Sequence, residues 1–117
     1  MKKAIFTTEI SMLRSTMQRL LRRKADTNLT KILRKTHQAD VALIMRGLNQ
    51  YEQKKIFTLC PTAKHKARLL EELDDSIIEN VLKFESAKNI SKVFRYLDTN
   101  DQAFIAGMFD LDKQKDV

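Results

Sequence analysis

Side chains that could carry out chemistry are few in this chain of 117 residues, and their spacing argues against catalysis. Cys60 is the single cysteine, and a nucleophilic pair would require it to converge with His65 beside oxyanion-stabilising donors. The sequence contains no HExxH, CxxC or Cys/His cluster, so we predict no zinc site. Two glycines in the whole chain exclude a phosphate-cradling loop. We expect a protein that is not an enzyme, with Cys60 as a small buried residue, His37 at a helix start and His65 in solvent.

Two acidic runs, Glu71–Glu72 and Asp74–Asp75, carry side chains that could bind a metal ion or act as an acid/base pair. They fall at the end of one expected helix and at the start of the next. Aspartate at a helix start caps free backbone N–H groups, and an exposed glutamate there simply faces water. We favour the capping interpretation, and the metal or acid/base role stays the alternative.

The N-terminal basic cluster is the strongest indication of function in the sequence. Its simplest interpretation is a solvated helix face. Three functional alternatives are docking on an acidic protein surface, contact with anionic lipid, and binding of nucleic-acid phosphates. No Trp or Tyr accompanies the first helix and aromatic residues are not interleaved with the arginines, so protein docking is favoured and nucleic acid is not. The cluster comprises Arg14, Arg19, Arg22, Arg23, Lys24, Lys31, Arg34 and Lys35.

Charge is spread unevenly along the chain, whose formal net charge is +7. Residues 1–35 hold ten Lys and Arg against Glu9 and Asp26, and the rest of the chain is nearly balanced. No apolar run approaches the ~20 residues that span a bilayer, and no signal-peptide core follows the first residues. A lone cysteine fits a reducing compartment. We therefore predict a cytoplasmic protein, brought to the inner face of a membrane only through a partner.

Helices must position these side chains, because the sequence shows helical periodicity throughout. Apolar residues recur at helical spacing near the start of the chain and predict an amphipathic helix over about 8–24, with Thr7 or Thr8 as its cap. A short second helix then begins near Leu29. The first apolar stripe comprises Phe6, Ile10, Leu13, Met17 and Leu20.

A repeat of about 24 residues begins near His37. Each unit contains an alanine, then a leucine followed by Asn or Asp, and then an apolar residue eleven positions beyond the leucine. These positions are Ala39, Ala63 and Ala87; Leu48, Leu73 and Leu97; and Leu59, Phe84 and Met108. Helix caps recur at matching places: a capping box of Asn49 and Glu52, then Thr62, Asp74, Ser86 and Asp98.

The pattern predicts an all-α fold in which short helical hairpins form a superhelical stack, either right- or left-handed. We expect one domain over 1–117. It would consist of a basic amphipathic helix within 1–27, a core of three hairpin repeats within 28–110, and a tail over 111–117.

The segment from about Leu29 to Phe109 resembles the intracellular N domain of MgtE-type magnesium transporters. The resemblance rests on three stretches: His37-Gln-Ala-Asp-Val-Ala42, Leu59-Cys-Pro-Thr-Ala-Lys64 and Leu69-Leu-Glu-Glu-Leu-Asp74. The middle domain of the flagellar rotor protein FliG belongs to the same superfamily. The resemblance implies a non-catalytic cytoplasmic regulatory domain that contacts other domains or proteins.

The resemblance also implies Mg²⁺ bound by acidic residues between domains. In the last repeat the family has acidic residues near the start and first turn of the helix. This sequence keeps Asp98 and Asp101 there, whereas Asn100 and Phe104 stand where carboxylates would help most. We expect no cofactor, and the alternative is a weak Mg²⁺ site at Asp98 and Asp101 together with the acidic edge over 71–75.

We therefore predict a regulatory, protein-interaction domain whose partner is an acidic protein surface or an adjacent domain of a larger chain. Its contact residues would be Arg14, Arg19, Arg22, Arg23, Lys24, Arg34 and Lys35. The alternatives are a Mg²⁺-sensing gating domain of a transporter and a nucleic-acid-binding helical domain. A homodimer stays open, as does the choice between a free-standing adaptor and part of a longer protein.

Overall fold

A computed structural model of the protein describes residues 2–83 and 85–115, with side chains over 8–83 and 85–108. Over these residues the chain forms eight helices and no strand, which confirms the all-α prediction. In chain order the helices are α1 (Lys2–Arg22), α2 (Asp26–Lys35), α3 (Gln38–Arg46), α4 (Gln50–Leu59), α5 (Ala63–Glu72), α6 (Asp75–Leu82), α7 (Ala87–Phe94) and α8 (Thr99–Lys115).

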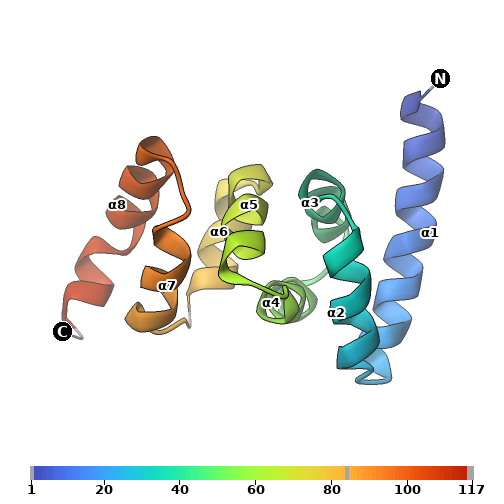
Figure 1. Cartoon of the computed structure of the whole chain (residues 1–117), viewed down its shortest axis with the longest axis horizontal. Helices are drawn as coiled ribbons and strands as arrows, with labels where there is room; N and C mark the ends of the chain where they lie inside the picture. Colours follow the sequence, from blue (N-terminus) through green and yellow to red (C-terminus); the bar gives the residue numbers. More distant parts are fainter. Residues whose placement is uncertain (1, 84, 116–117) are drawn as a thin grey trace.

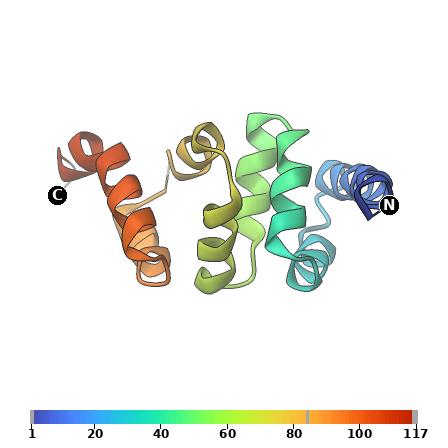
Figure 2. The same cartoon turned by 90° about the horizontal axis from the view of Figure 1, so that it is seen from above.

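The helices stack side by side into an elongated body of 44 × 33 × 21 Å (Figure 1). Helix α1 packs on α3, α3 on α5, and α5 on α7, while α2 packs on α4 and α4 on α6. Consecutive helices therefore alternate between two layers, as the view from above also shows (Figure 2). The α1–α2 pair follows the same alternation and forms one end of the stack, and α7 and α8 form the other. The grouping into a separate basic helix and three repeats stays a prediction.

One continuous apolar core runs between the two layers. Each helix after α1 has 8 to 17 residues, so its stability comes from packing on its neighbours. Met17 of the predicted first stripe and Leu29 of the predicted second helix belong to this core. Its largest fully enclosed side chains are Phe57, Met17, Leu29, Leu33, Ile44, Met45, Ile56, Leu69, Leu82 and Val81. The side chains of Phe6, from the first stripe, and Phe84, from the repeat pattern, lie outside the described residues.

The predicted caps start most of the helices. The Asn49 side chain accepts a hydrogen bond from the Glu52 N–H at 2.8 Å, and Glu52 accepts one from the Asn49 N–H, which confirms the capping box. Thr62 and Ser86 cap α5 and α7. Asp74 occupies the start of α6 without a side-chain cap, because its carboxylate instead pairs with Arg46 of α3.

The ends of two helices differ from the sequence prediction. Helix α1 begins at Lys2, so Thr7 and Thr8 lie inside it and do not cap its start. The physical reason is that Lys, Ala and Phe before them are all compatible with a helix, and nothing breaks the pattern. Helix α8 runs to Lys115, past the expected boundary at residue 110. Within the described chain, no helix is both long and apolar enough to cross a bilayer.

Candidate functional site

The N-terminal basic cluster lies on the last turns of α1, on the α1–α2 turn and on α2. Seven of its eight side chains are exposed, and none of them has a carboxylate of a described residue within ion-pair distance. They are Arg19, Arg22, Arg23, Lys24, Lys31, Arg34 and Lys35. The helix pair therefore presents a dense positive charge at one end of the stack, where it attracts an anionic surface.

Arg14, the eighth member, has a different environment. Its Nε donates a hydrogen bond to the Ile44 carbonyl and its Nη2 donates one to the Leu43 carbonyl, both at 3.2 Å. These carbonyls belong to the last turn of α3, where a cation is favourable and free acceptors need donors. Arg14 therefore ties α1 to α3.

The turn that carries the cluster is held in one conformation. Lys24 has a φ of 57°, which places it in the left-handed region. The Ala25 N–H donates to the Leu20 carbonyl at 2.9 Å and the Lys24 N–H donates to the Leu21 carbonyl at 3.1 Å. This pair of bonds is a Schellman motif, in which the left-handed position is usually glycine. The chain thus holds a lysine at a place where a side chain is energetically unfavourable.

The predicted metal ligands Asp98 and Asp101 come together with Glu71 of α5. One carboxylate oxygen from each of the three residues lies within 4.8 Å of the others. We call this group the acidic cluster. Partial burial and the nearby charges of Asp98 and Glu71 raise the pKa of Asp101 above its ordinary value.

Other contacts already occupy part of the acidic cluster. An Asp98 carboxylate oxygen accepts a hydrogen bond from the Asp101 N–H at 2.8 Å and so caps α8. The Arg68 guanidinium contacts both oxygens of Glu71 at 3.2 Å and donates to the Tyr96 carbonyl at 3.2 Å. The remaining oxygens are hard donors of the kind that Mg²⁺ prefers, and one or two carboxylates with water suffice for a weak site. The donor set therefore fits Mg²⁺.

The cysteine and histidines occupy structural positions. Cys60 is buried, its thiol donates to the Ile56 carbonyl at 3.5 Å, and burial raises its pKa to about 12. A thiol with that pKa is protonated at neutral pH and is a poor nucleophile. His37 caps α3, as predicted. His65 is not simply in solvent, because its Nδ1 lies 2.8 Å from the Thr62 hydroxyl oxygen at the start of α5.

Comparison with known families assigns the fold. The family model of the MgtE intracellular N domain matches residues 36–117. The chain belongs to this family. No curated protein and no solved structure matches the chain.

Only one of the two candidate sites lies within the residues that match the MgtE N domain. The match covers α3 to α8 and includes the acidic cluster, whereas every residue of the N-terminal basic cluster precedes it. The basic cluster is therefore a feature that this chain adds to the matched part of the domain.

Two features of the structure were not predicted from the sequence. Arg68, which neutralises Glu71, was not predicted, although the two residues are three apart on one helix. Its contact with the Tyr96 carbonyl joins residues that are 28 apart, which local spacing does not show. Helix α7 carries Lys88 and Lys92, and Arg95 follows it, with no acidic residue in this segment. Their spacing of four and three residues places them on one face of the helix. This local group of cations was not noticed because acidic and basic residues were counted together over the whole chain after residue 35.

Proposed function

We propose that this MgtE N domain is a non-catalytic cytoplasmic regulatory domain that docks on an acidic protein surface or an adjacent domain. The N-terminal basic cluster makes the contact. The observation that carries the proposal is a group of seven exposed cations on a helix pair that is anchored to the stack. No carboxylate in the described part of the chain pairs with any of them. Charge of this kind accelerates encounter with an acidic partner and fixes its orientation.

The anchoring favours docking by a rigid body. Met17, Leu29 and Leu33 are buried under the cluster and hold α1 and α2 against the other helices. Arg14 adds a polar tie to α3. A surface that does not rearrange loses little conformational entropy when a partner binds.

Lys24 gives independent support. Glycine at this left-handed position would be favourable by roughly 1 kcal/mol compared with a residue that has a Cβ. The lysine places a positive charge at the exposed tip of the turn. Strained residues of this kind often serve function, and here the charge itself is the candidate function.

The proposal is tested by site-specific photo-crosslinking in the cell that makes the protein. A crosslinking residue replaces Arg23, and the matched control replaces Glu79, an exposed residue of α6. Position 23 should yield one protein product with an acidic surface, and position 79 should not. The product should vanish in the variant Arg19→Gln, Arg22→Gln, Lys24→Gln. Crosslinks to nucleic acid or lipid alone, or a product unaffected by neutralisation, would contradict the proposal.

Neutralisation is a better test than deletion of the basic helix. Ile10 and Met17 of α1 are part of the core, so removing the helix would also expose apolar surface. Arg19, Arg22 and Lys24 are exposed, and replacing their charges leaves the core unchanged.

A second candidate function is Mg²⁺ sensing, and the acidic cluster favours it. Glu71, Asp98 and Asp101 would hold the ion, which would compensate the repulsion among their carboxylates. When bound, Mg²⁺ supplies positive charge that joins α5 to the start of α8. The test is a thermal melt with and without millimolar Mg²⁺, with Ca²⁺ and matched ionic strength as controls. At ten times the dissociation constant, binding would add about 1.4 kcal/mol to the stability. No Mg²⁺-specific shift would exclude this function for the isolated chain.

A further inference from the structure

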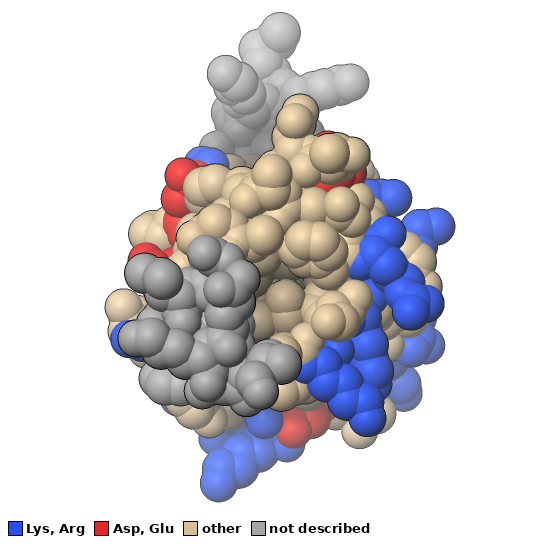
Figure 3. Space-filling model, turned by 90° about the vertical axis from the view of Figure 1, so that its left-hand side faces the viewer, with Lys and Arg blue, Asp and Glu red and all other residues tan. Residues whose placement is uncertain are grey.

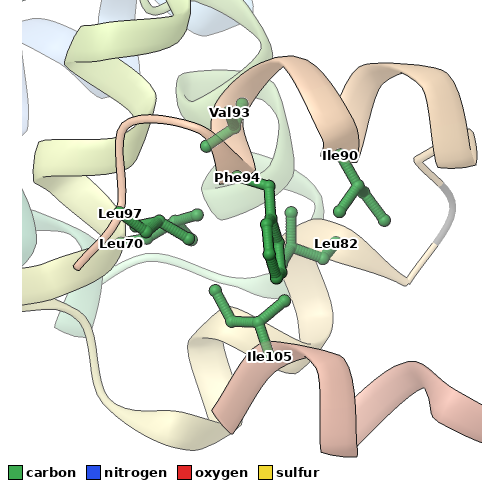
Figure 4. A pocket seen from close by; sticks show the side chains of 7 residues that line it. All are labelled: Leu70, Leu82, Ile90, Val93, Phe94, Leu97 and Ile105. Atoms are coloured by element: carbon green, nitrogen blue, oxygen red, sulfur yellow. The ribbon is translucent and has the colours of Figure 1, made fainter. Parts of the chain in front are cut away.

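Two hollows in the described chain differ in their chemistry, and the first lies at the α7–α8 end. It is a cavity of ≈ 10 Å³ lined by apolar side chains, and Phe94 points into it towards Leu82 and Ile105 (Figure 4). A water molecule needs roughly two to four polar partners, and the lining side chains offer none. The described surface over this end is mostly uncharged, with Lys and Arg along its right-hand edge (Figure 3). The cavity is therefore a packing gap and not a ligand site.

The second hollow, which we call the α2 hollow, lies along α2 at the other end of the stack (Figure 1). Its volume is ≈ 320 Å³, and small-ligand sites begin at about 300 Å³. Every residue that lines it is polar. The lining residues are Asp26, Thr27, Thr30, Lys31 and Arg34. All of them precede the part of the chain that matches the MgtE N domain, so the α2 hollow is not part of the matched domain.

The α2 hollow carries an excess of positive charge. Lys31 and Arg34 are exposed, and within the described chain no carboxylate lies at ion-pair distance from either of them. Asp26 is the acidic residue of the lining, but its Oδ2 pairs with Lys55 of α4 at 3.3 Å and its Oδ1 is buried. The ion pair balances the charge of Asp26, so the charges of Lys31 and Arg34 remain to attract an anion.

Side-chain donors in the α2 hollow suit the oxygens of an anionic group. Thr27, Lys31 and Arg34 are spaced by four and three residues, which places them on one face of α2, with neighbouring Cβ atoms about 5–6 Å apart. A guanidinium can bind a carboxylate through two parallel hydrogen bonds, and an ammonium acts as a compact charge beside it. Among the described residues the Thr27 hydroxyl has no bonding partner, whereas the Thr30 hydroxyl already donates to the Leu59 carbonyl at 3.3 Å.

We propose that the α2 hollow binds neighbouring carboxylates of an acidic protein segment. Arg34 pairs with one carboxylate, and Lys31 and the Thr27 hydroxyl hold the next. No apolar or aromatic side chain lines the hollow, so it offers neither a surface for acyl chains nor a platform on which bases stack. This inference rests on the docking function proposed for the N-terminal basic cluster, and it names the part of the partner that the cluster recognises.

The experiment uses the full chain and two fluorescein-labelled peptides of the same length. One contains a run of consecutive glutamates, and the other has glutamines at the same positions. Fluorescence anisotropy should show saturable binding of the glutamate peptide and none of the glutamine peptide. The double variant Lys31→Gln, Arg34→Gln should weaken binding by about tenfold or more, because close charge pairs contribute at this scale. Thr27→Val, which removes the hydroxyl and keeps the shape, should weaken binding severalfold.

The matched control is Arg19→Gln, Lys35→Gln, which removes the same charge from the same basic cluster outside the α2 hollow. At physiological salt it should leave the affinity within about twofold, because charges that do not touch the peptide are screened. All of these positions are exposed, and circular dichroism would verify that each variant is folded.

Equal weakening by the control and by the hollow variant would overturn the role of the α2 hollow. Docking by the basic cluster as a whole would still stand, since crosslinking from position 23 decides it separately. Absence of saturable binding of the glutamate peptide would overturn the inference as well. So would binding of inorganic phosphate through Lys31 and Arg34 without peptide binding, which would assign the hollow to phosphate groups.

Discussion

The α1–α2 end of the stack is held by both apolar and polar contacts. Met17 and Leu29 have no exposed surface. Arg14 reaches the last turn of α3, the Thr30 hydroxyl donates to the Leu59 carbonyl at 3.3 Å, and Asp26 pairs with Lys55 of α4 at 3.3 Å. Each polar contact joins this pair to the next pair along the stack.

The described contacts of the α7–α8 end are mainly apolar. Val93, Leu97 and Ile105 are buried there, beside the ≈ 10 Å³ cavity. The hydrogen bond from Gln102 to the Phe94 carbonyl, at 2.9 Å, stays within the pair, and Arg68 reaches the pair from α5 through the Tyr96 carbonyl. The comparison teaches that one helix pair can close a stack as a rigid platform for charge, while another packs beside a cavity and is held less tightly.

The largest expected effect comes from truncating one buried leucine at each end. Leu29→Ala should lower the free energy of unfolding by about 4 kcal/mol, and Leu97→Ala by about 2.5 kcal/mol. Leu29 is fully enclosed, whereas Leu97 already borders a cavity and loses fewer contacts. Urea denaturation of both variants gives the two values. An equal or larger cost for Leu97→Ala would break the comparison.

Removing the Arg14 tie should cost about 1–2 kcal/mol, because two α3 carbonyls lose a charged donor. Gly47→Ala tests the same contact from the other side, since a Cβ there would lie 2.5 Å from Arg14 Nε and displace the guanidinium. In a double-mutant cycle, Arg14→Ala with Gly47→Ala should cost no more than Arg14→Ala alone. The control is Arg46→Ala, which breaks an exposed ion pair and should cost under about 0.5 kcal/mol. Simple additivity would show that Gly47 acts independently of Arg14.

Lys24→Gly should raise the free energy of unfolding by about 1 kcal/mol, because glycine adopts the left-handed conformation without strain. Lys24→Ala serves as control, since it removes the charge and keeps the Cβ, and we expect little gain from it. Chemical denaturation measures both. If Lys24→Gly destabilised the protein, the strained turn would have to be stabilised by contacts of the lysine side chain.

The smallest effect concerns Asp101. Its pKa is raised in the folded protein, so folding favours the protonated carboxyl, and this contribution is lost as pH rises above the ordinary value of 3.8. Asp101→Asn removes the charged carboxylate that is unfavourable at pH 7, so it should raise the melting temperature at that pH by no more than ~2 °C. It should also abolish any Mg²⁺ response. Thermal melts at pH 4 and pH 7, each with and without Mg²⁺, measure both effects. An unchanged Mg²⁺ response in Asp101→Asn would show that Asp101 is not a Mg²⁺ ligand.

Local signals were sufficient to predict most of the fold. Helix breaks at Asn49, Thr62 and Ser86 depend on side chains that cap the nearest backbone, so the sequence shows them directly. The predicted start of α1 was wrong because threonine, the residue type at positions 7 and 8, is compatible with both a helix cap and a helix interior. The handedness of the stack has no local signal at all.

The candidate sites were less predictable because they depend on contacts between distant residues. Asp98 and Asp101 are neighbours in sequence, but only packing of α5 against the α7–α8 turn brings Glu71 to them. Arg14 is an arginine of α1, as are Arg19 and Arg22 of the basic cluster, so residue type and helix do not distinguish it from them. Its link to α3 spans 30 residues and cannot be read from spacing.

Native-state hydrogen exchange tests the difference between the two ends most directly. Amides of α2 and of the last turns of α1 should exchange with an opening free energy close to that of global unfolding. Amides of α7 and α8 should exchange through a smaller opening, because this pair packs beside a cavity. If the α1–α2 amides exchanged first, or if both ends exchanged through openings of equal free energy, the assignment of a rigid charged end and a less tightly held α7–α8 end would be contradicted.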